Sequence, residues 1–483
     1  MTLGELIGPE AKLSAAAAAL PIAGITADSR QVKPGYLFAA LSGVNTDGAR
    51  FAADAVARGA VAVLAVDEID LGVPVILDPD PRKALAVIAA RFFGSQPETA
   101  VAVTGTNGKT SVAAFTRQLW SDAGFSAASL GTVGVTSPGG TKVLQHTTPN
   151  PVELHGLLAG LSAEPVTHLA LEASSHGLQQ RRLDGVALKA GAFTNISRDH
   201  LDYHASFEDY FVQKLRLFTE LLPPGAVAVI DMDSPESRRV ADAAKARGLN
   251  VLTVGRTGET LRLVSAEIEG FAQRLTIEHA GKTYTVLLPL VGEFQASNAL
   301  VAAGLAMATG ASADAVLPQL AHLQGATGRL DLAGTSQYGA PIFIDYAHTP
   351  DALAKALDSL RPFAAKRLFV VFGCGGDRDR GKRPLMGAAA AAKSDVVIVT
   401  DDNPRGEDPA AIRDEILVAV PGGREIGDRD MAISEAIRML RTGDVLLVAG
   451  KGHETGQTIG TRVIPFSDHD AVSAALTKGT QLG

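Results

Sequence analysis

The sequence predicts an α/β fold of about three domains, in which buried and mainly parallel strands alternate with helices. At 483 residues the chain has room for three domains of roughly 150 residues each. Hydrophobic residues make up 46% of the chain, enough to bury a core in each domain. Apolar runs such as 101–103 and 226–230 alternate with helical stretches, the pattern of a parallel sheet whose crossovers are helices.

Three segments separate along the chain. Residues 1–97 carry short β-like runs between Ala-rich helical stretches and close in Phe92-Phe93-Gly94-Ser95-Gln96-Pro97, a linker composition. Residues 98–327 and 328–483 each repeat the alternation of buried strand and helix. Open α/β sheets bind ligands at the carboxyl ends of their strands, so the residues that follow the apolar runs are the candidates for function.

The bulk composition excludes several classes of partner. The net charge of −8 argues against nucleic acid, whose binding proteins are usually basic. No apolar run approaches the roughly 18 residues of a membrane span, and the start Met1-Thr2-Leu3-Gly4-Glu5 has no signal-peptide pattern. The single cysteine, Cys374, fits a reducing compartment and is expected to be a small buried hydrophobe. We expect a cytoplasmic protein without membrane insertion, acting as a monomer.

Residues 101–111, Val-Ala-Val-Thr-Gly-Thr-Asn-Gly-Lys-Thr-Ser, are the most informative stretch. They describe an apolar strand that runs into a glycine-rich turn and a helix. Gly105 and Gly108 tolerate positive φ and bring backbone N–H groups toward a ligand at the positive end of the helix dipole. Lys109 supplies charge for the β- and γ-phosphates of ATP, and the Thr110 hydroxyl is a hard ligand for Mg²⁺. An ordinary strand-to-helix turn would not need this Lys-Thr pair.

Two polar clusters follow later strands. Glu172 ends the run 168–171, which places a carboxylate near the phosphate loop, and residues 195–204 end another strand with two histidines and two aspartates. Neither cluster has the Cys/His spacing of a zinc site, and beside phosphates hard oxygen ligands for Mg²⁺ are the better interpretation. The alternative is that Glu172 and His200 cap helices or hold hydrogen bonds in the core.

Lys214 and Arg329 carry weaker signals. Lys214 lies in residues 210–218, which have helical periodicity, and from the residues alone it is an ordinary exposed helix lysine. Arg329 offers a positive charge for a transferring phosphoryl group, and residues 344–350 end a strand with an Asp/His pair.

The last segment has three charged strand ends. They are residues 373–383, 401–405 and 450–454. Arg378 and Arg405 facing Asp402 and Glu454 would suit a zwitterion, because arginines bind carboxylates bidentately and acids accept an ammonium. The alternative is a solvated surface of mixed charge.

Five motifs occur together and in order over nearly the whole chain. They are Thr104-Gly105-Thr106-Asn107-Gly108-Lys109-Thr110, Ser197-Arg198-Asp199-His200-Leu201-Asp202, Gly328-Arg329, Asp345-Tyr346-Ala347-His348-Thr349-Pro350 and Asp402-Asn403-Pro404-Arg405. On these motifs the chain resembles the Mur ligase family of peptidoglycan synthesis. The resemblance implies an N-terminal domain (1–97) for UDP, a central domain (98–327) for ATP and a C-terminal Rossmann-like domain (328–483) for the incoming amino acid.

The resemblance also implies an ATP-dependent, ADP-forming ligase. ATP would phosphorylate the D-glutamyl γ-carboxylate of UDP-MurNAc-L-Ala-D-Glu, and the amine of meso-2,6-diaminopimelate would attack the acyl phosphate. This chemistry agrees with the residues, because Lys109 and Mg²⁺ would neutralise the charge that develops on the phosphoryl group.

The family pattern assigns roles residue by residue. It places UDP contacts at Ser29, Val44, Asn45 and Thr46, and muramoyl-dipeptide contacts at Thr147, Thr148, Ser174, Gln180 and Arg182. It places the nucleotide at Gly105, Thr106, Asn107, Gly108, Lys109, Thr110, Ser111, Asn298, Arg329 and Asp345, and Mg²⁺ at Thr110, Glu172, His200 and Lys214. It places diaminopimelate at Arg378, Asp402, Asn403, Pro404, Arg405, Gly450 and Glu454. Lys109, Lys214, His200 and Arg329 would carry the catalysis.

Two of these positions change the interpretation of the sequence. Lys214 matches the lysine that the family carbamylates, which reverses its interpretation as an ordinary surface lysine. Arg405 matches the residue type that claims the distal carboxylate of diaminopimelate, and relatives that use lysine lack it. One departure is Gln295, which stands where the family often has asparagine and keeps an amide on a longer side chain.

Two other functions stay open. A sister ligase of the family, or one that adds glutamate to folate, shares the phosphate loop but not Arg405 or the UDP segment around Ser29. A nucleotide-dependent switch protein would turn over ATP independently of a muramoyl substrate and would form no coupled product.

Overall fold

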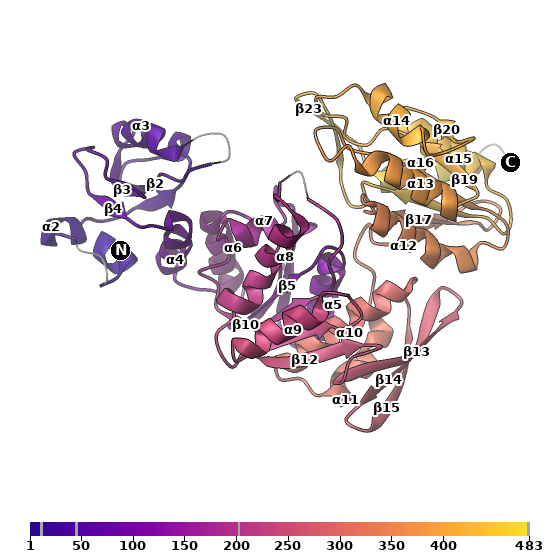
Figure 1. The fold of residues 1–483 in the computed structure, drawn as a ribbon, viewed down its shortest axis with the longest axis horizontal. Helices are drawn as coiled ribbons and strands as arrows, with labels where there is room; N and C mark the ends of the chain where they lie inside the picture. The colour runs from indigo at the N-terminus through magenta and orange to yellow at the C-terminus, as the bar shows by residue number, and fades with distance from the viewer. Residues whose placement is uncertain (10–12, 44–46, 201–202, 481–483) are drawn as a thin grey trace.

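The α/β architecture expected from the sequence is confirmed. The computed structural model describes residues 1–9, 13–43, 47–200 and 203–480. Within them the chain forms three bodies in succession, each built on a sheet of its own, from indigo through magenta to yellow in Figure 1. None of the helices in these residues is long and apolar enough to cross a membrane.

The N-terminal body is a small parallel sheet. Its strands follow one another in space as in the sequence: β1 (Gly24–Thr26), β2 (Tyr36–Ala39), β3 (Ala60–Ala65) and β4 (Val75–Leu77). Around them lie α1 (Leu3–Ile7), α2 (Ala15–Ala18), η1 (Ser29–Gln31), η2 (Gly48–Phe51), α3 (Ala52–Ala57) and α4 (Pro81–Phe93). Helix α4 packs on α6 of the central body and so joins the two.

The central body is built on one long sheet of eleven described strands, in the order β15-β14-β13-β12-β11-β10-β5-β9-β6-β7-β8. Its parallel core is β12 (Asn250–Gly255), β11 (Val227–Asp231), β10 (Leu188–Phe193), β5 (Thr99–Thr104), β9 (His168–Glu172) and β6 (Ala127–Gly131). At one edge β13 (Leu261–Glu269) joins β12 in parallel and continues into the antiparallel strands β14 (Ala272–His279) and β15 (Lys282–Leu288). At the other edge the antiparallel strands β7 (Gly134–Ser137) and β8 (Gly140–Lys142) follow β6.

Helices cover both faces of this parallel core. The side chains of β5 alternate between two apolar cores, with Val101 and Val103 on one face and Ala100 and Ala102 on the other. The first face carries α5 (Lys109–Asp122), α10 (Glu293–Ala308), α11 (Ala313–Val316) and η4 (Leu317–His322). The second carries α6 (Pro151–Ala163), α7 (Ser175–Gln179), α8 (Phe207–Arg216), η3 (Leu217–Leu221) and α9 (Ser237–Ala246). Burial on both faces explains the nearly continuous apolar strands.

The C-terminal body is a second doubly covered sheet, in the order β16-β17-β21-β18-β19-β20. All neighbours are parallel except β16 (Asp331–Thr335) against β17 (Pro341–Asp345), and the other strands are β21 (Val445–Ala449), β18 (Leu368–Phe372), β19 (Val396–Val399) and β20 (Arg424–Glu425). Its helices are α12 (Pro350–Leu360), η5 (Arg361–Phe363), α13 (Lys382–Lys393), α14 (Pro409–Leu417), α15 (Arg429–Met439) and α16 (Asp468–Thr480). A hairpin of β22 (Gly456–Ile459) and β23 (Arg462–Pro465) follows β21.

The boundaries at 97/98 and 327/328 stay predictions. They lie in the connections from α4 to β5 and from η4 to β16. The expected linker begins later than its composition indicates, because Phe92 and Phe93 still belong to α4, which ends where Gly94 adopts a φ of 77°. Cys374 is 3% exposed, as expected for a small buried hydrophobe, and burial raises the pKa of its thiol to about 12.

Candidate active site

The phosphate loop connects β5 to α5 and is shaped by its two glycines. Gly105 and Gly108 adopt φ values of 148° and 89°. A Cβ on Gly105 would lie 1.9 Å from Thr194 Oγ1, and one on Gly108 would lie 2.3 Å from Asn298 Oδ1. Glycine is therefore required here both by backbone conformation and by the close approach of neighbouring side chains.

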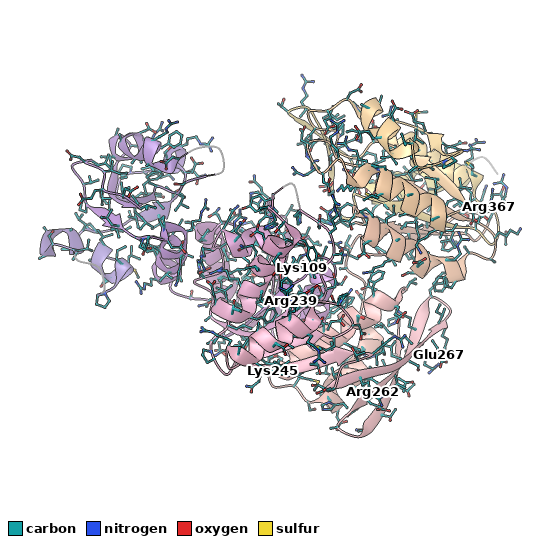
Figure 2. All side chains as sticks on the ribbon, viewed as in Figure 1. Lys109, Arg239, Lys245, Arg262, Glu267 and Arg367 are labelled. Atoms are coloured by element: carbon teal, nitrogen blue, oxygen red, sulfur yellow. The ribbon has the colours of Figure 1, made fainter. Side chains whose placement is uncertain are left out.

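Two lysines converge on this loop, the half-buried Lys109, labelled in the central body in Figure 2, and the buried Lys214. Lys109 Nζ donates to the carbonyl oxygens of Gly105 and Thr106, both at 2.9 Å. Lys214 Nζ donates to the same Gly105 oxygen at 2.7 Å. Within the described residues neither ammonium has a carboxylate within ion-pair distance. Two lysine side chains beside orienting backbone amides form a site for an anion.

Lys214 is not an exposed helix lysine. It is 1% exposed, on the face of α8 that packs toward the phosphate loop. Burial lowers the pKa of Lys214 well below its usual range, and the neighbouring Lys109 lowers it further. Tyr210, one turn earlier, contacts both the lysine and the loop: its ring centroid lies 4.4 Å from Lys214 Nζ, and its hydroxyl lies 3.0 Å from Thr106 Oγ1.

A cavity of about 630 Å³ opens beside the loop, between the central and C-terminal bodies. Its lining includes seven residues expected to contact the nucleotide, namely Asn107, Gly108, Thr110, Ser111, Asn298, Arg329 and Asp345. The other three, Gly105, Thr106 and Lys109, belong to the same loop but not to this lining. The volume, and a mainly apolar wall with a few polar side chains in it, suit a nucleotide-sized ligand.

Arg329 bridges the two bodies at this cavity. Its Nη2 donates to Thr110 Oγ1 at 3.0 Å, and its guanidinium carbon lies 4.7 Å from the ring centroid of Tyr346. Its buried Nε has no hydrogen-bond partner among the described residues, and an anionic ligand would supply one. Asp345 accepts from the backbone N–H groups of Leu330 and Ala347, both at 2.7 Å, and burial raises its pKa to about 6.

The residues expected to hold Mg²⁺ lie around the same loop. Glu172, 2% exposed, accepts from the backbone N–H and hydroxyl of Thr132 at 2.8 and 3.0 Å. Burial lowers the pKa of Lys109, and the charge of Glu172 partly opposes this shift, so Glu172 lies near that lysine. His200 has a φ of 53°, with Nε2 at 3.4 Å from Asp199 Oδ2. The described residues contain no group of three or more His, Cys, Asp or Glu side chains suited to a metal, and the expected set holds only two.

The residues expected at the muramoyl dipeptide form one connected cluster in the central body. Thr148 Oγ1 lies 3.1 Å from Ser174 Oγ and donates to the Glu172 carbonyl oxygen at 2.8 Å. Arg182 donates to the Thr148 carbonyl oxygen and, at 2.8 Å, to Gln180 Oε1. Thr147 Oγ1 lies 3.0 Å from the Thr132 hydroxyl that contacts Glu172. This chain of bonds links the expected substrate residues to the expected metal residues.

Ser29 is the expected UDP residue that the structure describes, and it lies in a different body from this cluster. Ser29 begins η1 in the N-terminal body, beside Asp28, which caps the turn through the Arg30 backbone N–H at 3.0 Å. Val44, Asn45 and Thr46 lie outside the described residues.

The amino-acid site holds a lysine beside the two acids expected there. Asp402 and Glu454 both pair with the ammonium of Lys451, at 3.5 and 3.1 Å, and Lys451 is 0% exposed. Whether the two acids face Arg378 and Arg405 stays a prediction. Asn403 accepts from the same ammonium at 3.1 Å and donates to Glu454 at 2.9 Å. A buried charge needs partners within reach, and Lys451 lies just after the end of β21, in the same sheet as β19, which precedes Asp402.

The arginines instead contact backbone. Arg378 is exposed and donates to the Asp377 carbonyl oxygen, and Arg405 donates to the Gly376 carbonyl oxygen at 2.9 Å. In the described chain neither has a carboxylate partner, so both guanidinium groups have capacity for an anion. Pro404 is buried, and Gly450, with a φ of 112°, would place a Cβ 2.9 Å from Asp402 Oδ2.

Two residues at these sites were not singled out from the sequence. Lys451 stands in the noted strand end 450–454, and its position between two glycines beside an acid was its only signal. Tyr210 stands four residues before Lys214, a spacing that puts both on one helix face. Gln295, the departure from the family pattern, is buried and accepts from Asn298 at 3.0 Å, so the longer side chain still reaches the expected neighbour.

The fold and the site together define an α/β protein with a phosphate loop at the end of one parallel sheet and a charged site on a second. Family models match three stretches: "Mur ligase family, catalytic domain" over residues 21–93, "Mur ligase middle domain" over 103–306 and "Mur ligase, glutamate ligase domain" over 328–452. The chain belongs to the Mur ligase family.

Similar proteins cover the chain almost completely. A UDP-N-acetylmuramoyl-L-alanyl-D-glutamate–2,6-diaminopimelate ligase of Bradyrhizobium diazoefficiens is 58% identical over 99% of both chains, and one of Mesorhizobium japonicum is 58% identical over the same shares. A solved structure of an enzyme of that name superposes with a TM-score of 0.72 at 33% identity over 99% of both chains. A MurF ligase of Thermotoga maritima in complex with ADP shares the fold, with a TM-score of 0.64 at 18% identity over 96% of this chain and 98% of that one.

Proposed function

We propose that this protein is an ATP-dependent, ADP-forming ligase that joins meso-2,6-diaminopimelate to the D-glutamyl γ-carboxylate of UDP-MurNAc-L-Ala-D-Glu. The single observation that supports it most is the pair of lysines on the Gly105 carbonyl oxygen, neither of which has an ion-pair partner among the described residues, in a loop built for phosphates. The names and the near-complete coverage of the similar proteins support the choice of substrates.

The central residues would activate the acceptor carboxylate. Lys109, Arg329 and the backbone amides of the phosphate loop would neutralise the γ-phosphoryl group of ATP as it passes to the glutamyl oxygen, giving an acyl phosphate and ADP. Arg329 precedes the first strand of the C-terminal body and already contacts Thr110 of the phosphate loop. Positively charged side chains from both bodies would therefore surround the phosphates of bound ATP. The acyl phosphate turns a poor leaving oxygen into a good one, and the amine then displaces phosphate.

Magnesium fits the donors that surround the loop. The Thr110 hydroxyl and Glu172 are hard oxygen ligands, and His200 lies on the neighbouring strand-end loop. A carbamate on Lys214 would add two oxygens, and its formation requires the neutral amine that burial of Lys214 favours. When bound, the metal would supply charge neutralisation for the phosphoryl oxygens.

The C-terminal loops would bind the amino acid. Arg405 would hold the distal carboxylate of diaminopimelate, with Arg378 beside it, and Asp402, Asn403 and Glu454 would receive an ammonium. We place the reaction in the cytoplasm because the chain has a single cysteine. The net negative charge supports the absence of nucleic-acid partners. That the protein acts as a monomer stays a proposal.

The test is the release of ADP with all three substrates and with each one omitted, together with the mass of the product. The proposal expects ADP release only in the complete mixture and a product heavier than the muramoyl substrate by diaminopimelate less water. ADP release that does not depend on the muramoyl substrate would favour a nucleotide-dependent switch protein. Addition of glutamate to folate would favour the ligase that uses folate as its acceptor.

A further inference from the structure

Two loops that leave adjacent strands carry the arginines of the amino-acid site. Residues 373–381 follow β18 and carry Arg378, and residues 400–408 follow β19 and carry Arg405. Strands β18 and β19 are parallel neighbours, so both loops emerge at the same sheet edge. The position of each guanidinium therefore depends on what holds these two loops together.

Each loop caps the backbone of the other with a carboxylate. Glu407 Oε1 accepts from the backbone N–H of Asp377 at 2.6 Å. Asp377 Oδ2 in turn accepts from the backbone N–H of Gly406 at 3.0 Å. These reciprocal bonds, which we call the loop lock, fix the spacing of the loops at the level of the residues beside Arg378 and Arg405. Charge-assisted bonds of this kind are among the stronger hydrogen bonds of proteins.

A buried arginine, Arg383, pairs with the Glu407 carboxylate of the loop lock. Arg383 is 0% exposed and donates to both oxygens of Glu407, at 2.8 and 3.0 Å. It also donates to Glu415 at 2.9 Å and to the Gly375 carbonyl oxygen at 3.3 Å. The hydrogen bonds from Arg383 lower the pKa of Glu407 to about 2, so this carboxylate stays charged at neutral pH. The loop lock therefore rests on a bidentate ion pair that is charged under physiological conditions.

Arg405 reaches the opposite loop with its side chain, while its backbone bonds the β22–β23 hairpin, through its N–H to the Thr458 carbonyl oxygen at 3.0 Å and through its carbonyl oxygen to the Gly460 N–H at 2.7 Å. It adopts a φ of 51°, a left-handed value that costs a non-glycine residue strain unless neighbouring contacts fix it. Its guanidinium donates to the Gly376 carbonyl oxygen at 2.9 Å, and the Gly376 N–H donates to the Asn403 carbonyl oxygen at 2.9 Å. A Cβ on Gly376 would lie 1.9 Å from the Pro404 carbonyl oxygen, so the loops already touch as closely as backbones can.

We propose that Glu407, Asp377 and Arg383 are positioning residues for amino-acid selection: they hold the two loops at the spacing at which Arg405 meets the distal carboxylate of the diamino dicarboxylic acid. This inference rests on the proposed function, because it takes Arg405 as the carboxylate-binding residue. L-Lysine lacks the distal carboxylate, so its reaction does not depend on where Arg405 stands. The loop lock therefore acts on selection between the two amino acids and not on phosphoryl transfer.

The experiment compares Glu407→Gln and Asp377→Gly with the control Glu435→Gln in the full-length protein. The substitution Glu407→Gln keeps the shape of the side chain but not the charge that pairs with Arg383, and glycine tolerates the φ of 52° at position 377 without the carboxylate. Glu435 lies in α15 of the same body and pairs with Arg438 and Arg424, which lie outside both loops. We measure kcat/KM for meso-diaminopimelate and for the slow reaction with L-lysine, KM for ATP, and the thermal midpoint.

Loosening the loop lock is expected to lower kcat/KM for diaminopimelate by about tenfold, as is usual when the support of a binding residue is removed. The value for L-lysine and KM for ATP should change less than about twofold, and the control should behave as the parent. In the double variant Glu407→Gln/Arg405→Ala the loss should equal that of Arg405→Ala alone, because Glu407 acts through Arg405.

Equal losses for both amino acids, or additive losses in the double variant, would overturn the proposal, since a merely structural role lowers both. If Arg405→Ala weakens diaminopimelate use while Glu407→Gln and Asp377→Gly do not, the loop lock is refuted and the proposed function stands. If Arg405→Ala itself leaves the use of diaminopimelate unchanged, the assignment of Arg405 fails instead.

Discussion

The phosphate loop and the amino-acid loops hold their charges in opposite ways. At the phosphate loop, Lys109 and Lys214 donate to one carbonyl oxygen and have no carboxylate at ion-pair distance among the described residues. At the amino-acid loops, Lys451 lies between Asp402 and Glu454, and Arg383 lies between Glu407 and Glu415. The lysines of the first site therefore have no ion-pair partner in the described chain, whereas Lys451 and Arg383 at the second site each have two.

This difference indicates how each site works. Removal from water disfavours the charged form of a lysine that has no ion-pair partner, and an anionic ligand beside Lys109 or a carbamate formed on Lys214 would relieve this cost. The phosphate loop is therefore completed by its ligand. The amino-acid site must discriminate between similar zwitterions, which requires groups held at fixed spacing before the ligand arrives. Its internal ion pairs provide that fixed spacing.

The largest expected effect comes from Lys109→Ala. Removing this charge from the transferring phosphoryl group should lower kcat on the order of a thousandfold. The measurement is ADP release under saturating substrates, with Lys245→Ala on the exposed surface of α9 as the control (Figure 2). If Lys109→Ala keeps the parent kcat, the charge of Lys109 has no role in turnover, and the contrast between the two sites is contradicted.

A loss on the order of a hundredfold is expected for Lys214→Ala, if a carbamate on this lysine helps to hold the metal. A short carboxylic acid in solution should restore part of the activity, because it would supply the missing oxygens in the space left by the side chain. The assay is the same ADP release with increasing acid, and Lys109→Ala under the same acid is the control that should stay inactive. If the acid restores no activity, the proposal that a carbamate on Lys214 helps to hold the metal is contradicted.

Arg405→Ala should act on one substrate alone. Loss of a charge-assisted pair with the distal carboxylate is worth about 2 kcal/mol, which is a rise of roughly 30-fold in KM for diaminopimelate. KM for ATP should stay close to the parent value. Equal increases in both constants would place Arg405 outside the amino-acid pocket and weaken the contrast between the two sites.

The smallest expected effect is on acid stability. The native pKa of Glu407 is about 2, below the ordinary carboxyl value of 4.5, so its contribution to stability is complete above pH 4.5 and is lost as pH falls from 4.5 toward 2. The thermal midpoint of the parent should therefore fall more steeply between about pH 6 and 3.5 than that of Glu407→Gln, with the parent more stable at about pH 6. Parallel curves for the two proteins would show that the ion pair contributes nothing to stability.

The parts of the molecule that could be predicted from the sequence are those encoded by neighbouring residues. The phosphate loop is one continuous stretch, so its strand, glycine turn and helix start follow from residues 101–111 alone. The parallel cores follow from short, continuously apolar strands, because burial on both faces removes the polar alternation. The antiparallel extension β13–β15 was not foreseen, although Leu261, Leu263 and Leu275 alternate toward the core.

The parts that could not be predicted depend on the order of strands in space. Lys451 lies beside Asp402 because β21 and β19 are the two neighbours of β18 in the sheet. No local pattern in the sequence encodes this order of strands. Lys214 is buried because α8 lies against a loop more than a hundred residues earlier in the chain, as its bond to Gly105 shows. In both cases a charged residue that looks solvated in the sequence is buried by distant partners.

One measurement tests the central claim most directly: phosphate release with ATP and the muramoyl dipeptide, compared for meso-diaminopimelate, L-lysine, L-ornithine and no amino acid. The account predicts release with diaminopimelate and little with the other amino acids, because only diaminopimelate brings a second carboxylate to Arg405. Equal release with L-lysine would contradict the role of the amino-acid loops, and release without any muramoyl substrate would contradict the ligase itself.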